Sequence, residues 1–252
     1  MEETFFFLSS RSCGITSYVT DADGNIKFGS IIYNKPNMKE ETILKNEWIN
    51  RYGLTAVTQS KYYKIVGCFA IGFELMKIRG KIQPYFVIYP LWLEDVKECF
   101  GFSFLYHCIE DTKGLNYSLS ISKMLEKKEE IFQNAEIYLN FDMKKNIHKN
   151  DLLRFLDLYL ERYDIPYDQR IVIEMMTRMA TFLNDESLFE QTVANMESIY
   201  ADKRIFMEKY FAKSDDWKNF LVSIFSNRQA MLDKIEENIA DGKIKAQVEL
   251  LP

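Results

Sequence analysis

The sequence predicts an α+β protein with a β-rich N-terminal part, residues 1–146, followed by a helical C-terminal part, residues 147–252. Two observations predict this division. Nine of the ten glycines lie between Gly14 and Gly114, and only Gly242 comes later. Glycine suits turns and bulges but costs about 1 kcal/mol inside a helix. The apolar residues also change from strand-like runs to helical spacing after residue 146.

The first part begins with three strand-like runs at residues 4–9, 15–20 and 26–33, which are rich in β-branched and aromatic side chains. The segment Asp21–Asn25 joins the second run to the third. Its Asp-Gly pair is typical of a hairpin turn, and its spacing does not match a calcium-binding loop. A helix is expected to begin after Pro36 and to end by Gly53.

The rest of this part predicts an antiparallel or mixed sheet with one or two helices. The expected strands are residues 54–59, 63–78, 82–89, 102–109 and 136–141, and the expected helices are residues 91–100 and 121–132. The lysine-rich stretch 144–150 is interpreted as the junction between the two parts.

Four amphipathic helices with short connections then predict a four-helix bundle. The expected helices begin at Asn150 or Asp151, at Pro166, at Asn184 or Asp185 and at Ser214, and the last ends at Gly242. The first three are expected to end near Tyr163, Leu183 and Phe211.

Composition indicates a globular chain that stays in the cytoplasm. The 252 residues are 47% hydrophobic and 27% charged, with a net charge of −5 that belongs wholly to residues 147–252. No apolar run approaches the roughly 18 residues of a membrane span, and the first residues lack the basic flank of a signal peptide. Nucleic-acid binding is disfavoured because it needs a basic face. Because the chain is expected to stay in the cytoplasm, we interpret the four cysteines, Cys13, Cys68, Cys99 and Cys108, as reduced thiols.

No cofactor or metal site is predicted. The Gly-x-x-x-x-Gly-Lys-Ser/Thr and Gly-x-Gly-x-x-Gly phosphate loops are absent, as are Gly-x-Ser-x-Gly and His-Glu-x-x-His. Cys99, His107 and Cys108 supply zinc ligand types, but the spacing is wrong, since adjacent residues of a strand point to opposite faces.

One acidic constellation suggests an enzymatic alternative. Asp95 precedes the expected strand at residues 102–109, and Asp111 and Lys113 follow it directly. Two carboxylates and a lysine could bind a magnesium ion and a phosphodiester, as in a metal-dependent nuclease or phosphodiesterase. The competing interpretation is a plain turn at residues 110–114.

A basic alternation provides a candidate binding surface. Lys77, Arg79 and Lys81 would share one face of an extended strand and could bind an anion or an acidic partner. The competing interpretation is a lysine-protected sheet edge.

The leading hypothesis is a non-catalytic protein-binding module, such as an inhibitor, an immunity-type protein or an assembly component. It would act through its acidic helical part on a protein partner, and an acidic helical surface would suit a basic one. Met175, Met176 and Met179 would either fill a core or form an adaptable contact surface. The third alternative is a structural subunit of a larger assembly.

Overall fold

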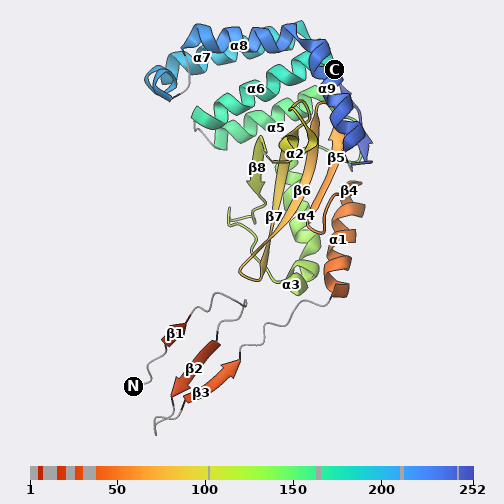
Figure 1. Ribbon diagram of the computed structural model, residues 1–252, viewed down its shortest axis with the longest axis vertical. Coiled ribbons are helices and arrows are strands. Elements are labelled where there is room, and N and C mark those ends of the chain that lie inside the picture. Colours follow the sequence, from red (N-terminus) through yellow and green to blue (C-terminus); the bar gives the residue numbers. More distant parts are fainter. Residues whose placement is uncertain are drawn as a thin grey trace. The chain divides into compact units, whose positions relative to one another are not determined.

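Figure 1 shows the computed structural model, which describes residues 5–7, 16–20, 26–30, 38–101, 103–162, 166–210, 213–242 and 244–252. The chain forms two compact units, Met1–Glu41 and Thr42–Pro252. In the first unit β1 (Phe5–Phe7), β2 (Thr16–Thr20) and β3 (Ile26–Ser30) form an antiparallel sheet in that order. Thr20 pairs with Ile26, which confirms the expected hairpin, while its turn at residues 21–25 lies outside the described residues.

The second unit contains the main sheet, in the order β10-β5-β6-β7-β8. The strands are β5 (Lys61–Val66), β6 (Phe69–Ile78), β7 (Lys81–Pro90), β8 (Leu105–Cys108) and β10 (Gln247–Val248). Neighbours from β5 to β8 are antiparallel, whereas β10 runs parallel to β5. A short strand, β4 (Thr55–Ala56), also pairs with β5.

The expected single strand at residues 63–78 is wrong, because the chain reverses between Val66 and Phe69. Gly67 allows this turn with a φ of 58°. A second tight turn joins β6 to β7, where Arg79 and Gly80 have φ values of 50° and 77°. Both central residues of a two-residue hairpin with a type I′ turn have positive φ, and this geometry matches the twist of the strands.

Helix α1 (Met38–Tyr52) ends before Gly53, as expected. Helix α2 (Val96–Cys99) lies between β7 and β8, and α3 (Ile121–Glu126) and α4 (Lys128–Leu139) follow β8. The expected strand at residues 136–141 is wrong, since most of it is the last turn of α4. The buried residues of α4 are Ile131, Phe132, Ala135 and Leu139, and this spacing is that of one helix face.

The C-terminal part is helical and makes the chain an α+β protein, as predicted. Its helices in the described residues are α5 (Lys149–Arg162), α6 (Pro166–Leu183), α7 (Glu186–Tyr210), α8 (Ser214–Ser226) and α9 (Arg228–Asp241). There are thus five helices here rather than the expected four. The expected fourth helix is interrupted at Asn227, where ψ is 36°.

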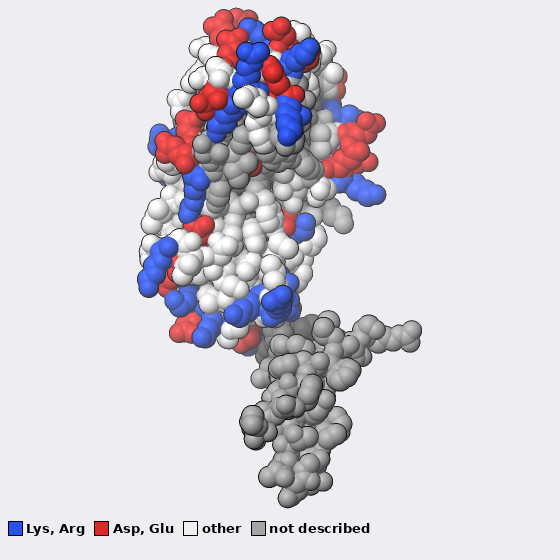
Figure 2. Space-filling view, turned by 90° about the vertical axis from the view of Figure 1, so that its left-hand side faces the viewer, with Lys and Arg blue, Asp and Glu red and all other residues white. Residues whose placement is uncertain are grey.

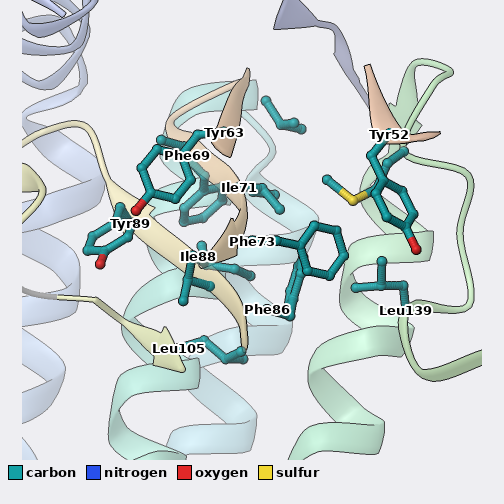
Figure 3. Close-up of a cluster of buried hydrophobic side chains, with 14 of the residues drawn as sticks. Tyr52, Tyr63, Phe69, Ile71, Phe73, Phe86, Ile88, Tyr89, Leu105 and Leu139 are labelled. Atoms are coloured by element: carbon teal, nitrogen blue, oxygen red, sulfur yellow. The ribbon is translucent and has the colours of Figure 1, made fainter. Parts of the chain in front are cut away.

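Helices α1, α4 and α5 pack on one face of the main sheet. Trp48 of α1 and Phe132 of α4 meet with ring centroids 5.1 Å apart, and Trp48 also lies 4.7 Å from Phe73 of β6. Phe155 of α5 lies 5.3 Å from Phe86 of β7. Figure 3 shows Phe73 and Phe86 pointing towards Leu139 and Tyr52, on the helical side of the sheet.

The same core continues into the C-terminal helices. Met175, Met176 and Met179 of α6 are buried in it, and so is Leu250 near the C-terminus. The methionine cluster therefore fills the core and is not a contact surface. The division into compact units also differs from the expected division at residue 146, because residues on both sides of that position share one core.

The chain returns to the main sheet at its C-terminal end. Gln247 pairs with Ile65 of β5, and β11 (Leu250–Leu251) pairs in parallel with β9 (Ile147–His148). Among the described residues, no helix has both the length and the apolar character that crossing a membrane requires.

Candidate functional site

The second face of the main sheet carries an unusual set of side chains. Paired residues of an antiparallel sheet share a face, so the pairs Ile78–Lys81 and Met76–Gln83 place their side chains together. Tyr85 and Tyr106 belong to the same face on β7 and β8. We call Met76, Ile78, Gln83, Tyr85 and Tyr106 the tyrosine face.

Large side chains on the tyrosine face are exposed. The exposed fractions are 39% for Met76 and 38% for both Ile78 and Tyr106, although a solvated sheet face is usually polar. The rings of Tyr85 and Tyr106 stack with centroids 4.4 Å apart, and the Tyr106 hydroxyl donates to the Met76 sulfur. These contacts join the exposed Met76 and Tyr106 to the half-buried Tyr85 in one arrangement.

A buried carboxylate lies on the same sheet face, beside this surface. Glu74 of β6 is 6% exposed, and its Oε1 accepts hydrogen bonds from the hydroxyls of Tyr63 and Tyr89, the latter at 2.7 Å. Lys61 lies 3.1 Å from the same oxygen and supplies the counter-charge. A buried carboxylate is tolerated when it is paired and hydrogen-bonded in this way.

The tyrosines of this region are neutral hydroxyls. Burial and then the hydrogen bond to Glu74 raise the pKa of Tyr63 and of Tyr89 above its ordinary value. Burial and then the charge of Glu74 raise the pKa of Tyr106 as well. The tyrosine face therefore offers aromatic surface and hydroxyl groups without ionised phenolates.

The upper end of the same sheet face is covered by the segment around α2. The ring of Phe100, directly after α2, stacks on the ring of Tyr63 with centroids 5.5 Å apart. Its centroid also lies 5.3 Å from that of the Tyr89 ring. The covered end and the exposed tyrosine face thus follow each other along β6 and β7. Figure 1 shows α2 beside the upper part of the sheet.

The structure places the predicted nuclease residues Asp95 and Asp111 towards opposite ends of β7. Asp95 follows the Pro90 end of β7 and caps α2 by accepting from the backbone N–H of Glu98 at 2.8 Å. Asp111 lies near the other end of β7, where it accepts backbone N–H groups of Lys113 and Leu115 at 2.8 and 2.9 Å.

The two backbone hydrogen bonds lower the pKa of the Asp111 carboxyl. Both predicted carboxylates, Asp95 and Asp111, serve local backbone geometry. Among the residues that the structure describes, no three His, Cys, Asp or Glu side chains gather in a way that could bind a metal ion.

The predicted basic residues lie around a turn and not along one strand face. Lys77 ends β6, Arg79 is in the turn, and Lys81 begins β7. All three are exposed. Lys81 pairs with Ile78, so it lies at the border of the tyrosine face.

The helical part does not present one sign of charge. Its acidic residues are partly balanced in place, for example in the pairs Lys218–Glu197 at 2.7 Å and Arg204–Glu208 at 2.9 Å. Figure 2 shows lysine and arginine interspersed with acidic residues over the helices at the top of the molecule. Acidic and basic side chains are therefore mixed on the face of these helices that Figure 2 shows.

The cysteine interpretation holds where the structure describes it, since Cys68, Cys99 and Cys108 are buried free thiols. Cys13 lies outside the described residues. Burial raises the pKa of the Cys108 thiol to about 11 and lowers the pKa of His107 to about 3. Neither group is therefore in the ionised state that thiolate or imidazolium catalysis requires at neutral pH.

The comparisons with known proteins give no relative: no family model, no curated protein and no solved structure matches this chain.

Proposed function

We propose that the chain is a non-catalytic protein-binding module and that the tyrosine face is its binding surface. The observation that carries this proposal is the adjacency of three large exposed side chains, Met76, Ile78 and Tyr106, on one sheet face. Tyrosine and methionine are enriched at protein interfaces, where they bury much area at little entropic cost. An inhibitor or assembly role in the cytoplasm, as expected from the sequence, is compatible with such a surface.

We propose that the partner has acidic residues at the rim of its contact surface. Lys77, Arg79 and Lys81 are exposed at the hairpin that borders the tyrosine face, and cations there would steer an acidic surface towards it. This replaces the basic partner that the acidic helices suggested. Aromatic sheet faces also bind single-stranded RNA, but the net charge of −5 disfavours RNA.

Site-specific photo-crosslinking tests the proposal. The full-length chain would carry benzoylphenylalanine in place of Tyr106, or in place of Phe206 of α7 as a control. Phe206 is 39% exposed, which matches Tyr106 at 38%. Crosslinked proteins from native lysate are identified by mass spectrometry, and each candidate partner is purified and titrated against the wild-type chain.

We expect a crosslink that depends on the Tyr106 position and identifies an acidic protein. Tyr106→Glu should then weaken binding by tenfold or more, because truncating a central interface aromatic typically costs about 2 kcal/mol. Phe206→Glu should leave the affinity unchanged. The proposal fails if both positions crosslink equally, if the captured species is RNA or a second copy of this chain, or if Tyr106→Glu binds like the wild type.

A further inference from the structure

A hollow of about 370 Å³ lies apart from the tyrosine face, where α6, the α8–α9 corner and the loop after β7 meet. Pockets of this size are within the range that binds small ligands. Trp92, Phe220 and Met231 contribute apolar walls, and Arg178 and Ser223 contribute polar groups. Phe220 is 38% exposed, so an aromatic ring at this hollow remains open to solvent.

Arg178 is the charged group of this hollow. Its side chain is 17% exposed, and its guanidinium lies over the Trp92 ring at 5.0 Å from the centroid. Among the described residues, the guanidinium makes one long polar contact, from Nη2 to Glu174 Oε1 at 3.5 Å. Its Nε is buried and has no hydrogen-bond acceptor among the described residues. Arginine stays charged under all physiological conditions, so this cation is weakly compensated.

Two other charged residues, Lys234 and Glu94, line the hollow. Lys234 pairs with Glu237 at 2.6 Å, and Glu94 adds a negative charge to the lining. A phosphate dianion needs more than one uncompensated cation, whereas a carboxylate matches a single guanidinium fork. The apolar walls exclude water and favour a ligand with an apolar body.

We propose that this hollow binds a carboxylate attached to an apolar body, with Arg178 as its recognition group. A medium-chain fatty acid and the C-terminus of a peptide ending in an apolar residue share this chemistry. The site is independent of the tyrosine face and of the proposed protein-binding function.

Isothermal titration calorimetry of the full chain tests this inference. One arm compares octanoate with octanol, and the other compares a tripeptide ending in leucine as the free acid with its C-terminal amide. The disruptive variant is Ser223→Glu, which places a negative charge at the hollow on an exposed position of α8. The matched control is Ser226→Glu, which adds the same charge at an exposed position of the same helix that does not line the hollow.

We expect saturable binding of at least one carboxylate, one molecule per chain, and at least tenfold weaker binding of its uncharged counterpart. Ser223→Glu should weaken binding about tenfold or more, since like charges a few ångströms apart in a partly buried site repel strongly. Ser226→Glu should bind as the wild type does. Preference for octanoate or for the peptide acid identifies the source of the ligand.

Three outcomes would overturn the inference. Neither carboxylate gives a saturable heat, or the uncharged counterparts bind as tightly, or Ser226→Glu weakens binding as much as Ser223→Glu. Thermal unfolding of both variants is the folding control, and we expect both to remain folded because both substitutions are at exposed positions of α8.

Discussion

Lys64 gives a sharp test of how the sheet and the helices pack. This lysine of β5 is 2% exposed on the helical side of the sheet, and its ammonium donates to the backbone carbonyl of Met143. Burial lowers its pKa from 10.5 to about 8, although the charge of Asp142 acts in the opposite direction. We expect Lys64→Met to remove this perturbed titration.

The magnitude follows from linkage. A difference of one pKa unit between the folded and unfolded states corresponds to about 1.4 kcal/mol, so the protonated Lys64 destabilises the folded state by about 3 kcal/mol at pH 7. Between pH 8 and pH 10.5 the unfolded state binds more protons than the folded state at this position. The contribution of Lys64 to stability therefore rises with pH across that window, by about 2–3 kcal/mol between pH 7 and pH 10.

The assay is urea unfolding of the wild type and of Lys64→Met at several pH values from 7 to 10. Other lysines and the tyrosines titrate in both proteins, so only the difference between the two stabilities is interpreted. We expect the advantage of Lys64→Met over the wild type to shrink by about 2–3 kcal/mol as pH rises. Lys97→Met, at an exposed position of α2, is the control and should give a constant difference. A difference that does not change with pH for Lys64→Met would refute the burial of a charged amine at this position.

Three further substitutions test particular contacts. Gly72→Ala should prevent stable folding, because the alanine Cβ would lie 2.0 Å from the backbone oxygen of Tyr62. The control is Gly101→Ala, whose Cβ would lie no closer than 3.1 Å to any neighbouring atom. Urea unfolding compares the stabilities of the two variants. His107→Phe should make the chain less sensitive to acid. Folding lowers the pKa of His107 from 6.5 to about 3, so the contribution of His107 to the free energy of unfolding is lost as pH falls from 6.5 towards 3. Circular dichroism between pH 3 and pH 7 should show this. Arg228→Met should lower the melting temperature and cost about 2–3 kcal/mol, because its two hydrogen bonds, at 2.9 and 3.1 Å, satisfy carbonyls in the last turn of α6.

Elements with local boundary signals could be predicted from the sequence. Helix α1 begins shortly after Pro36 and ends before Gly53, where φ is 62°. Asp185 accepts from the backbone N–H of Leu188, so it caps α7 as its residue type suggests. In these cases the side chain or the backbone freedom of one residue decides the boundary, and no distant contact is needed.

Elements without such signals could not be placed. The run from Tyr63 to Ile78 is buried on both faces over most of its length, so no alternation marks the reversal at Gly67. In α4, Ile137 is 75% exposed, but with Leu139 and Phe141 it places an apolar residue at every second position, which is the pattern of a strand. The two-residue strands at the C-terminus exist only through pairing with β5 and β9, which no local pattern encodes.

The candidate site shows the same limit. Met76 and Ile78, like Gln83 and Tyr85, are two residues apart, and this spacing places each pair on one strand face. The strand pattern does not predict which face of the sheet the helices cover. The covered face becomes core and the other becomes surface, so the exposure of these side chains could not be predicted. The nuclease hypothesis was based on residue types and order alone, and these do not indicate the local contacts that the structure gives the two carboxylates. Asp95 and Asp111 are polar residues with local roles, a helix cap and a turn.

The net charge of −5 is therefore a weak guide to the binding surface of this protein. Acidic residues on the helices have lysine and arginine partners nearby, so the field of the excess charge is spread over several helices. The tyrosine face, in contrast, lies beside Glu74 on the same sheet face, and the charge of Glu74 is compensated by Lys61 and two tyrosine hydroxyls. This buried network uses hydrogen bonds to position the strands and leaves Tyr106 and its neighbours neutral. A partner would thus gain contact area from a fixed aromatic surface, with the hairpin cations acting mainly on the rate and orientation of encounter.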